Sequence, residues 1–151
     1  MDKRDLEQLL SDVAGGSVTP ADALTRIQTA PTADLGFAQL DLSRGVRQGA
    51  GEVVYGAGKT AEQIAAIIEA LRDAGQERIL VTRLDAEKAA HTAALLDNDI
   101  DLGYVPDAQL ALVGGKPSPT GNGRIVVACA GTSDLPVAEE AALTAEFYGN
   151  E

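Results

Sequence analysis

The chain is poor in aromatic residues, with two Phe, three Tyr and no Trp among its 151 residues. Its core must therefore be built from Ala, Leu, Ile and Val, which favours α/β architecture and disfavours aromatic stacking on nucleic acid. Basic residues are also scarce: 12 Lys and Arg stand against 23 Asp and Glu, a formal net charge of −11. Such a chain is unsuited to a polyanionic partner, although a few local positive groups are enough to bind a small anion.

Cysteine and histidine occur once each, as Cys129 and His91. A single cysteine excludes an internal disulfide and a zinc site made of several thiolates, so we expect no metal site. Cys129 lies in an apolar run and is expected to be a small core residue, while His91 is expected to be structural. No apolar run approaches the roughly 20 residues that cross a bilayer, and the first residues do not form a signal peptide. We therefore expect a cytoplasmic protein.

What is present is a 45% apolar composition, typical of a globular protein. Hydrophobic spacing predicts a helix over residues 4–13 and a second that begins at Pro20 behind the N-cap Thr19, followed by a linker-like segment at 29–36. Further along, the pattern predicts these elements: strands at 37–40, 52–55 and 78–83, a helix with Thr60 and Gln63 as a capping box, a helix capped by Asp85, and a hairpin turning at Pro106-Asp107.

The stretch "GGKPSPTGNG", residues 114–123, is the clearest boundary, because four glycines and two prolines favour neither helix nor strand. The run "RIVVACA" then predicts a buried strand, and a helix follows from Leu135. A lone strand and helix cannot bury both faces of a sheet, so this unit needs further structure to pack on. We therefore divide the chain into a helical segment (1–30), an α/β N-terminal domain (31–113), a linker (114–123) and the opening βα unit of a truncated domain (124–151).

The stretch "VVYGAGKT" invites comparison with a phosphate-binding loop. A Walker A loop needs a glycine where Val53 stands, and the next strand ends in Arg83 rather than in an aspartate, so an NTPase is disfavoured. Gly56, Gly58 and Ala61 also fit a loose dinucleotide-binding pattern, but the ribose-binding acid is missing. One alternative is a plain strand-to-helix turn capped by the threonine that follows. The other is an anion site, because the helix start also carries Lys59.

Two arginines, Arg44 and Arg47, lie three residues apart beside glycines. On a helix they would share a face and would be able to grip a phosphate or carboxylate. Ion pairing with some of the 23 acidic residues explains them equally well. The sequence leaves both readings open.

The stretch "AGTSD" follows the predicted strand at 124–130. Small residues there would let the backbone approach a ligand, and Ser133 and Asp134 stand at a helix N-terminus, where N–H groups and a hydroxyl suit a phosphate. Simple capping of the helix by one of them is the alternative reading. Capping by one does not prevent ligand contact by the other.

Taken together, "FAQLDLSRGVRQGAGEVVYGAGKTAEQ", "ILVTR" and "GRIVVACAGTSDLPVAEEAALTAEFYGNE" resemble the LarB family of nickel-pincer cofactor biosynthesis proteins, from about Phe37 to Glu151. The resemblance implies a pyridinium-3,5-biscarboxylic acid mononucleotide synthase, which uses nicotinic acid adenine dinucleotide and CO₂ or bicarbonate and releases AMP. It also implies an α/β N-terminal domain before a flavodoxin-like domain similar to aminoimidazole ribonucleotide carboxylase, assembled as a homo-octamer. No bound cofactor is implied, and Mg²⁺ is possible.

In that carboxylase superfamily a loop G-S-x-S-D holds the substrate's phosphate and ribose, and Ser133 and Asp134 match its last two residues. Gly131 departs from the serine of the pattern. Members of the family are about a hundred residues longer and carry their catalytic cysteine in that part, to which Cys129 does not correspond. We therefore assign no catalytic residue and expect the chain to be inactive alone. The candidate substrate-binding residues are Gly131, Thr132, Ser133, Asp134, Arg44, Arg47, Tyr55 and Lys59. The alternative is a non-catalytic assembly or interaction domain.

Overall fold

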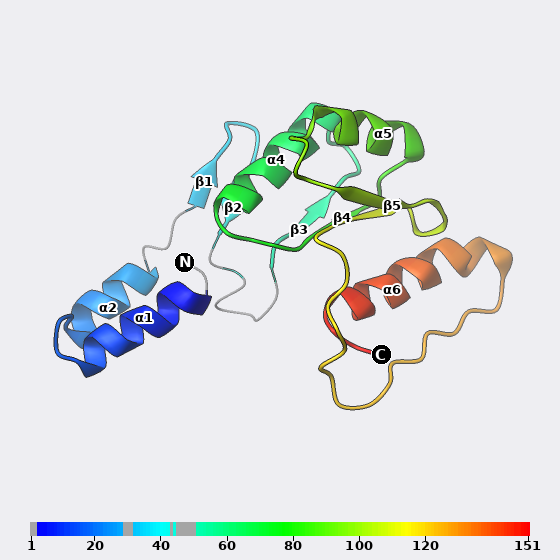
Figure 1. Cartoon of the computed structure of the whole chain (residues 1–151). Helices are drawn as coiled ribbons and strands as arrows, with labels where there is room; N and C mark the ends of the chain where they lie inside the picture. The colour runs from blue at the N-terminus through cyan, green and yellow to red at the C-terminus, as the bar shows by residue number, and fades with distance from the viewer. Residues whose placement is uncertain (1–2, 29–31, 43, 45–50) are drawn as a thin grey trace. The chain divides into compact units, whose positions relative to one another are not determined.

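The computed structural model describes residues 3–28, 32–42, 44 and 51–151 (Figure 1). The fold is α/β, as predicted, with helices and a mixed parallel and antiparallel sheet. Two compact units make up the chain: Met1–Glu52 together with Ala70–Gln76, and Val53–Glu69 together with Glu77–Glu151. The domain boundaries expected from the sequence stay a prediction.

The first unit contains helices α1 (Lys3–Ala14) and α2 (Pro20–Gln28) and a small antiparallel pair, β1 (Thr32–Asp34) and β2 (Gln39–Asp41). The cap of α2 is confirmed, because Asp22 N–H donates to Thr19 Oγ1 at 3.1 Å. The linker expected at 29–36 is wrong over residues 32–34, where β1 pairs with β2. The alternating signal of a three-residue strand is too short to be recognised in sequence.

The second unit is built on a four-stranded sheet of β3 (Val53–Tyr55), β4 (Ile79–Thr82), β5 (Leu102–Val105) and β6 (Leu110–Val113), in the order β3-β4-β6-β5. β3 and β4 are parallel, and the other neighbours are antiparallel. The predicted hairpin is confirmed: β5 and β6 are joined by a 3₁₀ turn, η1 (Pro106–Ala108).

Helices cover both faces of this sheet (Figure 1). Helices α4 (Ala61–Asp73) and α5 (Ala86–Leu95) lie on one side, and α6 (Leu135–Phe147) lies on the other. The buried residues of the α6 side form one cluster: Leu80, Ala108, Leu110, Leu112, Leu143 and Phe147. Burying side chains such as those of Leu143 and Phe147 contributes about 1.5–3 kcal/mol each, so α6 is firmly attached to the sheet.

The structure of the segment between β6 and α6 contradicts two expectations from the sequence. The buried strand predicted over 124–130 is wrong: residues 124–129 have no regular secondary structure, and the side chain of Val126 is 85% exposed. Cys129, expected in a core, is exposed as well. An extended run becomes a strand only when a neighbouring strand pairs with its backbone, and no described strand does so here. Instead Ile125 N–H donates to Glu151 O at 2.8 Å.

Candidate anion-binding site at the carboxyl ends of two parallel strands

The carboxyl ends of β3 and β4 lie at the same edge of the sheet because the two strands are parallel. The loop 56–60 leads from β3 into α4, and the loop 83–85 leads from β4 into α5. In α/β sheets this edge is the usual place for ligands, because loops and helix N-termini converge there. The two loops therefore define the candidate site.

Gly56 is held tightly at the start of the first loop. Its N–H donates to Thr82 O at 2.7 Å, which continues the pairing of β3 with β4 beyond the strands. A Cβ atom at this position would stand 2.9 Å from Thr82 O and 3.3 Å from Arg83 O. Only glycine permits this approach. Two residues on, Gly58 has φ +80°, a left-handed conformation that glycine adopts without strain.

Lys59 and the start of α4 complete the loop. The ammonium group of Lys59 donates to Tyr55 O at 2.9 Å, and the backbone N–H of Lys59 donates to Gly56 O at 3.2 Å. The predicted capping box is confirmed, because Gln63 N–H donates to Thr60 Oγ1 at 3.2 Å and Thr60 N–H donates to Gln63 Oε1 at 3.0 Å. Tyr55 is 57% exposed, so two of the predicted substrate-binding residues lie together beside this capped helix start.

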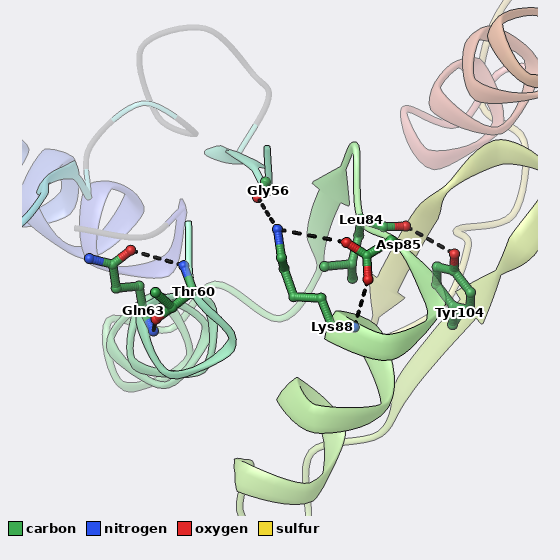
Figure 2. A network of polar contacts seen from close by, with 7 residues as sticks. All are labelled: Gly56, Thr60, Gln63, Leu84, Asp85, Lys88 and Tyr104. Atoms are coloured by element: carbon green, nitrogen blue, oxygen red, sulfur yellow. Dashed lines mark hydrogen bonds and ion pairs between the residues drawn. The ribbon is translucent and has the colours of Figure 1, made fainter. Parts of the chain in front are cut away.

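A second lysine reaches the first loop from the neighbouring βα unit. Lys88, in the first turn of α5, extends its ammonium group to Gly56 O at 3.2 Å (Figure 2). Asp85 caps the same helix, as predicted, by accepting from Lys88 N–H at 2.8 Å through Oδ1. Its Oδ2 lies 3.9 Å from Lys88 Nζ. The side chain of Lys88 is only 24% exposed, so this contact is partly shielded from water.

The loop 83–85 is held by residues of β5 and of the turn that follows β5. Tyr104 on β5 donates its hydroxyl to Leu84 O at 2.9 Å (Figure 2), and Leu84 N–H donates to Gln109 O at 2.8 Å. Burial raises the pKa of the Tyr104 phenol, and the negative charge of Asp85 raises it further. Next to these residues Arg83 has φ 56°, a conformation uncommon outside glycine.

A charged pair lies on the helices that follow the two loops. Glu62 on α4 and His91 on α5 approach to 3.7 Å, and both side chains are mostly exposed. Backbone hydrogen bonding at the helix start lowers the pKa of Glu62, with smaller contributions in the same direction from the Thr60 hydroxyl and from His91. His91 therefore faces a carboxylate of the neighbouring helix.

The other predicted site residues lie elsewhere. Gly131 precedes a 3₁₀ turn, η2 (Thr132–Asp134), at the start of α6, and the three residues of that turn are exposed. In the first unit Arg44 forms an ion pair with Glu52 at 3.0 Å, the alternative considered for it from the sequence. Arg47 lies outside the described residues.

Sequence reasoning missed the participation of Lys88 and Tyr104. A signal for Lys88 exists, since it stands three residues after the N-cap aspartate, where its side chain turns back toward the strand ends. Nothing in the sequence connects Tyr104 with Leu84, because the two are joined only by the pairing of β4, β6 and β5.

Chemically the arrangement supplies hydrogen-bond donors and positive charge. Each ammonium group has three donors. In the contacts described above, Lys59 uses one on Tyr55 O, at the end of β3, and Lys88 uses one on Gly56 O. The N-terminus of α4 adds N–H groups and a partial positive charge. Across residues 3–28, 32–42, 44 and 51–151, no group of three or more His, Cys, Asp or Glu side chains is placed to hold a metal ion. The two ammonium groups and the helix N-terminus suit an anionic ligand.

Comparison with known proteins identifies the framework around these loops. The family model of the LarB/PurE-like N-terminal domain matches residues 32–114, which include β3, α4, β4 and α5. The chain belongs to this family. A comparison with curated proteins gave no match. Membership relates the chain to carboxylases of the LarB/PurE kind. None of the helices in the described part of the chain is long and apolar enough to cross a bilayer.

Proposed function

We propose that this chain is the N-terminal part of a LarB-type pyridinium carboxylase and hydrolase in nickel-pincer nucleotide biosynthesis. In the proposed reaction CO₂ replaces a ring proton of nicotinic acid adenine dinucleotide, and water cleaves the phosphoanhydride. The products are pyridinium-3,5-biscarboxylic acid mononucleotide and AMP. The family match over residues 32–114 supports the class of reaction, and the resemblance of residues 131–134 to a phosphate-binding loop supports the substrate.

The contribution proposed for this chain is binding of the dinucleotide's phosphates. The observation that carries it is the position of Lys59 at a capped helix start, beside strand ends that a second lysine also reaches. Tyr55 lies next to it with an exposed ring suited to contact a base or pyridine ring. We assign no catalytic step to these residues.

The binding claim is tested by calorimetric titration of the chain with nicotinic acid adenine dinucleotide and by its melting temperature. A ligand at a hundred times its Kd stabilises the folded state by about 2.7 kcal/mol, which is readily measured. Lys59→Ala is expected to weaken binding, whereas Lys116→Ala, at a lysine paired with Glu146, is the matched control. Adenosine triphosphate, which has phosphates but no pyridine ring, is expected to give a smaller shift.

The claim of inactivity has its own assay. The chain incubated with the dinucleotide and bicarbonate is expected to release no AMP, because the residues that would do the chemistry are not assigned within it. Release of AMP above the rate of a heat-denatured sample would contradict this part of the proposal and leave the binding claim standing.

A non-catalytic assembly domain is the second candidate. Exposed apolar side chains at Ile125, Val126, Leu135 and Val137 favour it, since such residues suit contact with another protein surface. Light scattering coupled to gel filtration distinguishes the two. A change of oligomer size in Lys59→Ala, with dinucleotide binding intact, supports assembly, whereas lost binding at unchanged size supports the substrate site. The proposed octamer of the family is tested by the same measurement.

A further inference from the structure

Lys88 connects two βα units that are far apart in the sequence. It stands on α5, after β4, yet its ammonium group binds the carbonyl of Gly56, 32 residues earlier, in the loop that follows β3 (Figure 2). The same carbonyl accepts the N–H of Lys59. Gly56 O therefore accepts hydrogen bonds both from α5, through Lys88, and from the residue that precedes the N-cap of α4, through Lys59.

The strength of this contact follows from its surroundings. A hydrogen bond with a charged donor is about twice as strong as a neutral one, and partial burial of Lys88 reduces competition from water. Asp85 fixes the backbone at Lys88 through its cap and stays 3.9 Å from Nζ. Such a spacing orients the ammonium group and leaves its contact with the loop in place.

The loop residues that follow Gly56 are less buried than Gly56 itself. Gly58 is exposed, and a Cβ atom there would meet nothing within 4 Å. The position of Lys59 and Thr60 depends on Gly56 O, which accepts from both lysines, on the bond from Lys59 Nζ to Tyr55 O, and on the capping box. We infer that Lys88 is a positioning residue, which holds the loop 56–60 in the conformation that binds the phosphates. This inference rests on the function proposed above.

The first test measures the loop itself. Hydrogen exchange of the amides of residues 57–60 is compared between the unchanged chain and Lys88→Met, which keeps the aliphatic stem and removes the charged donor. Exchange in the loop is expected to rise about tenfold in Lys88→Met and to stay near the unchanged value in Lys88→Arg. Amides of residues 107–109, in the hairpin turn, serve as the internal control. Unchanged exchange at 57–60 would overturn the inference.

The second test measures affinity for nicotinic acid adenine dinucleotide by calorimetry, well below the melting temperature of each variant. Lys88→Met is expected to bind about tenfold more weakly, with Lys88→Arg within about threefold of the unchanged chain and Lys116→Met unaffected. Equal affinity of Lys88→Met and the unchanged chain would overturn the inference. If the unchanged chain does not bind, the proposed function fails, and the exchange experiment alone decides whether Lys88 positions the loop.

Discussion

The two loops that the sequence predicts as phosphate contacts differ in what fixes them. The loop 56–60 begins at a buried glycine whose N–H donates to Thr82 O at the end of β4. Its Gly56 carbonyl also accepts a hydrogen bond from Lys88 on α5. The turn 131–134 is held by backbone bonds within the turn itself, from Asp134 N–H to Gly131 O at 3.1 Å and from Leu135 N–H to Thr132 O, and the Asp134 side chain makes no capping bond to α6. Both loops begin with glycine and lead into a helix, yet the bonds described for the first come partly from other elements, whereas those described for the second lie within the turn.

This difference matters for binding. A loop whose donors are already held in place loses less conformational freedom when a ligand arrives, so more of the contact energy contributes to affinity. Of the two loops, 56–60 is therefore the better prepared to bind an anion within this chain. The following predictions test the contrast between the two loops, and then compare residues in the helices.

The largest effect is expected from adding one methyl group to each loop's first glycine. Gly56→Ala places a Cβ atom against two backbone carbonyls that cannot move aside, and we expect a loss of about 2 kcal/mol in the free energy of unfolding. At Gly131 φ is −134° and the nearest atoms, 3.6–3.7 Å away, belong to side chains. Gly131→Ala is therefore expected to change stability by less than about 0.5 kcal/mol. Urea unfolding of both variants measures this, and equal losses would remove the contrast.

The caps of the two helices give the next test. Thr60→Ala removes the hydroxyl that accepts from Gln63 N–H and should cost about 1 kcal/mol, the usual value for an N-cap. Asp134→Ala removes no side-chain cap bond at the start of α6, and its cost should stay within about 0.5 kcal/mol. Thermal unfolding of the two variants measures the difference. A cost at Asp134 as large as that at Thr60 would show that both turns are equally fixed.

The same contrast explains what sequence could predict. Caps and turns depend on residues close in the chain, so Thr19, Thr60, Asp85 and the hairpin at Pro106 were predicted correctly. Strand formation depends on a partner elsewhere, and the run 124–130 has the composition of a strand without any described strand beside it. The helix beginning at Leu135 was predicted, but its packing against Leu80 and Leu110 was not. The Lys88–Gly56 contact was missed for the same reason, because it depends on the parallel pairing of β3 and β4.

Two helical threonines are expected to respond with opposite changes in stability when each is replaced by valine. Thr92 on α5 is fully buried, and its hydroxyl has no hydrogen-bond partner among the described residues. Thr92→Val replaces this hydroxyl with a methyl group of similar size and should raise the free energy of unfolding by about 1 kcal/mol. Thr144 on α6 donates to Glu140 O at 2.6 Å, so Thr144→Val should lower it by about 0.5 kcal/mol. Chemical denaturation measures the change in the free energy of unfolding for both variants. A loss of stability in Thr92→Val would mean that the Thr92 hydroxyl is hydrogen-bonded in solution.

The smallest effect concerns the charge at the start of α4. Helix-end hydrogen bonding lowers the pKa of Glu62 below its ordinary value of 4.5, so its carboxylate stabilises the folded state more than its protonated form does. A lowered folded pKa contributes stability that is complete above pH 4.5 and is lost as the pH falls through the folded value. The melting temperature of the unchanged chain should therefore exceed that of Glu62→Gln at pH 6, by an amount that shrinks toward pH 3. In a Thr60→Ala background, which removes one cause of the lowered pKa, this pH-dependent difference should be smaller. A difference that is constant from pH 6 to pH 3 would show that the charge of Glu62 does not contribute to the start of α4.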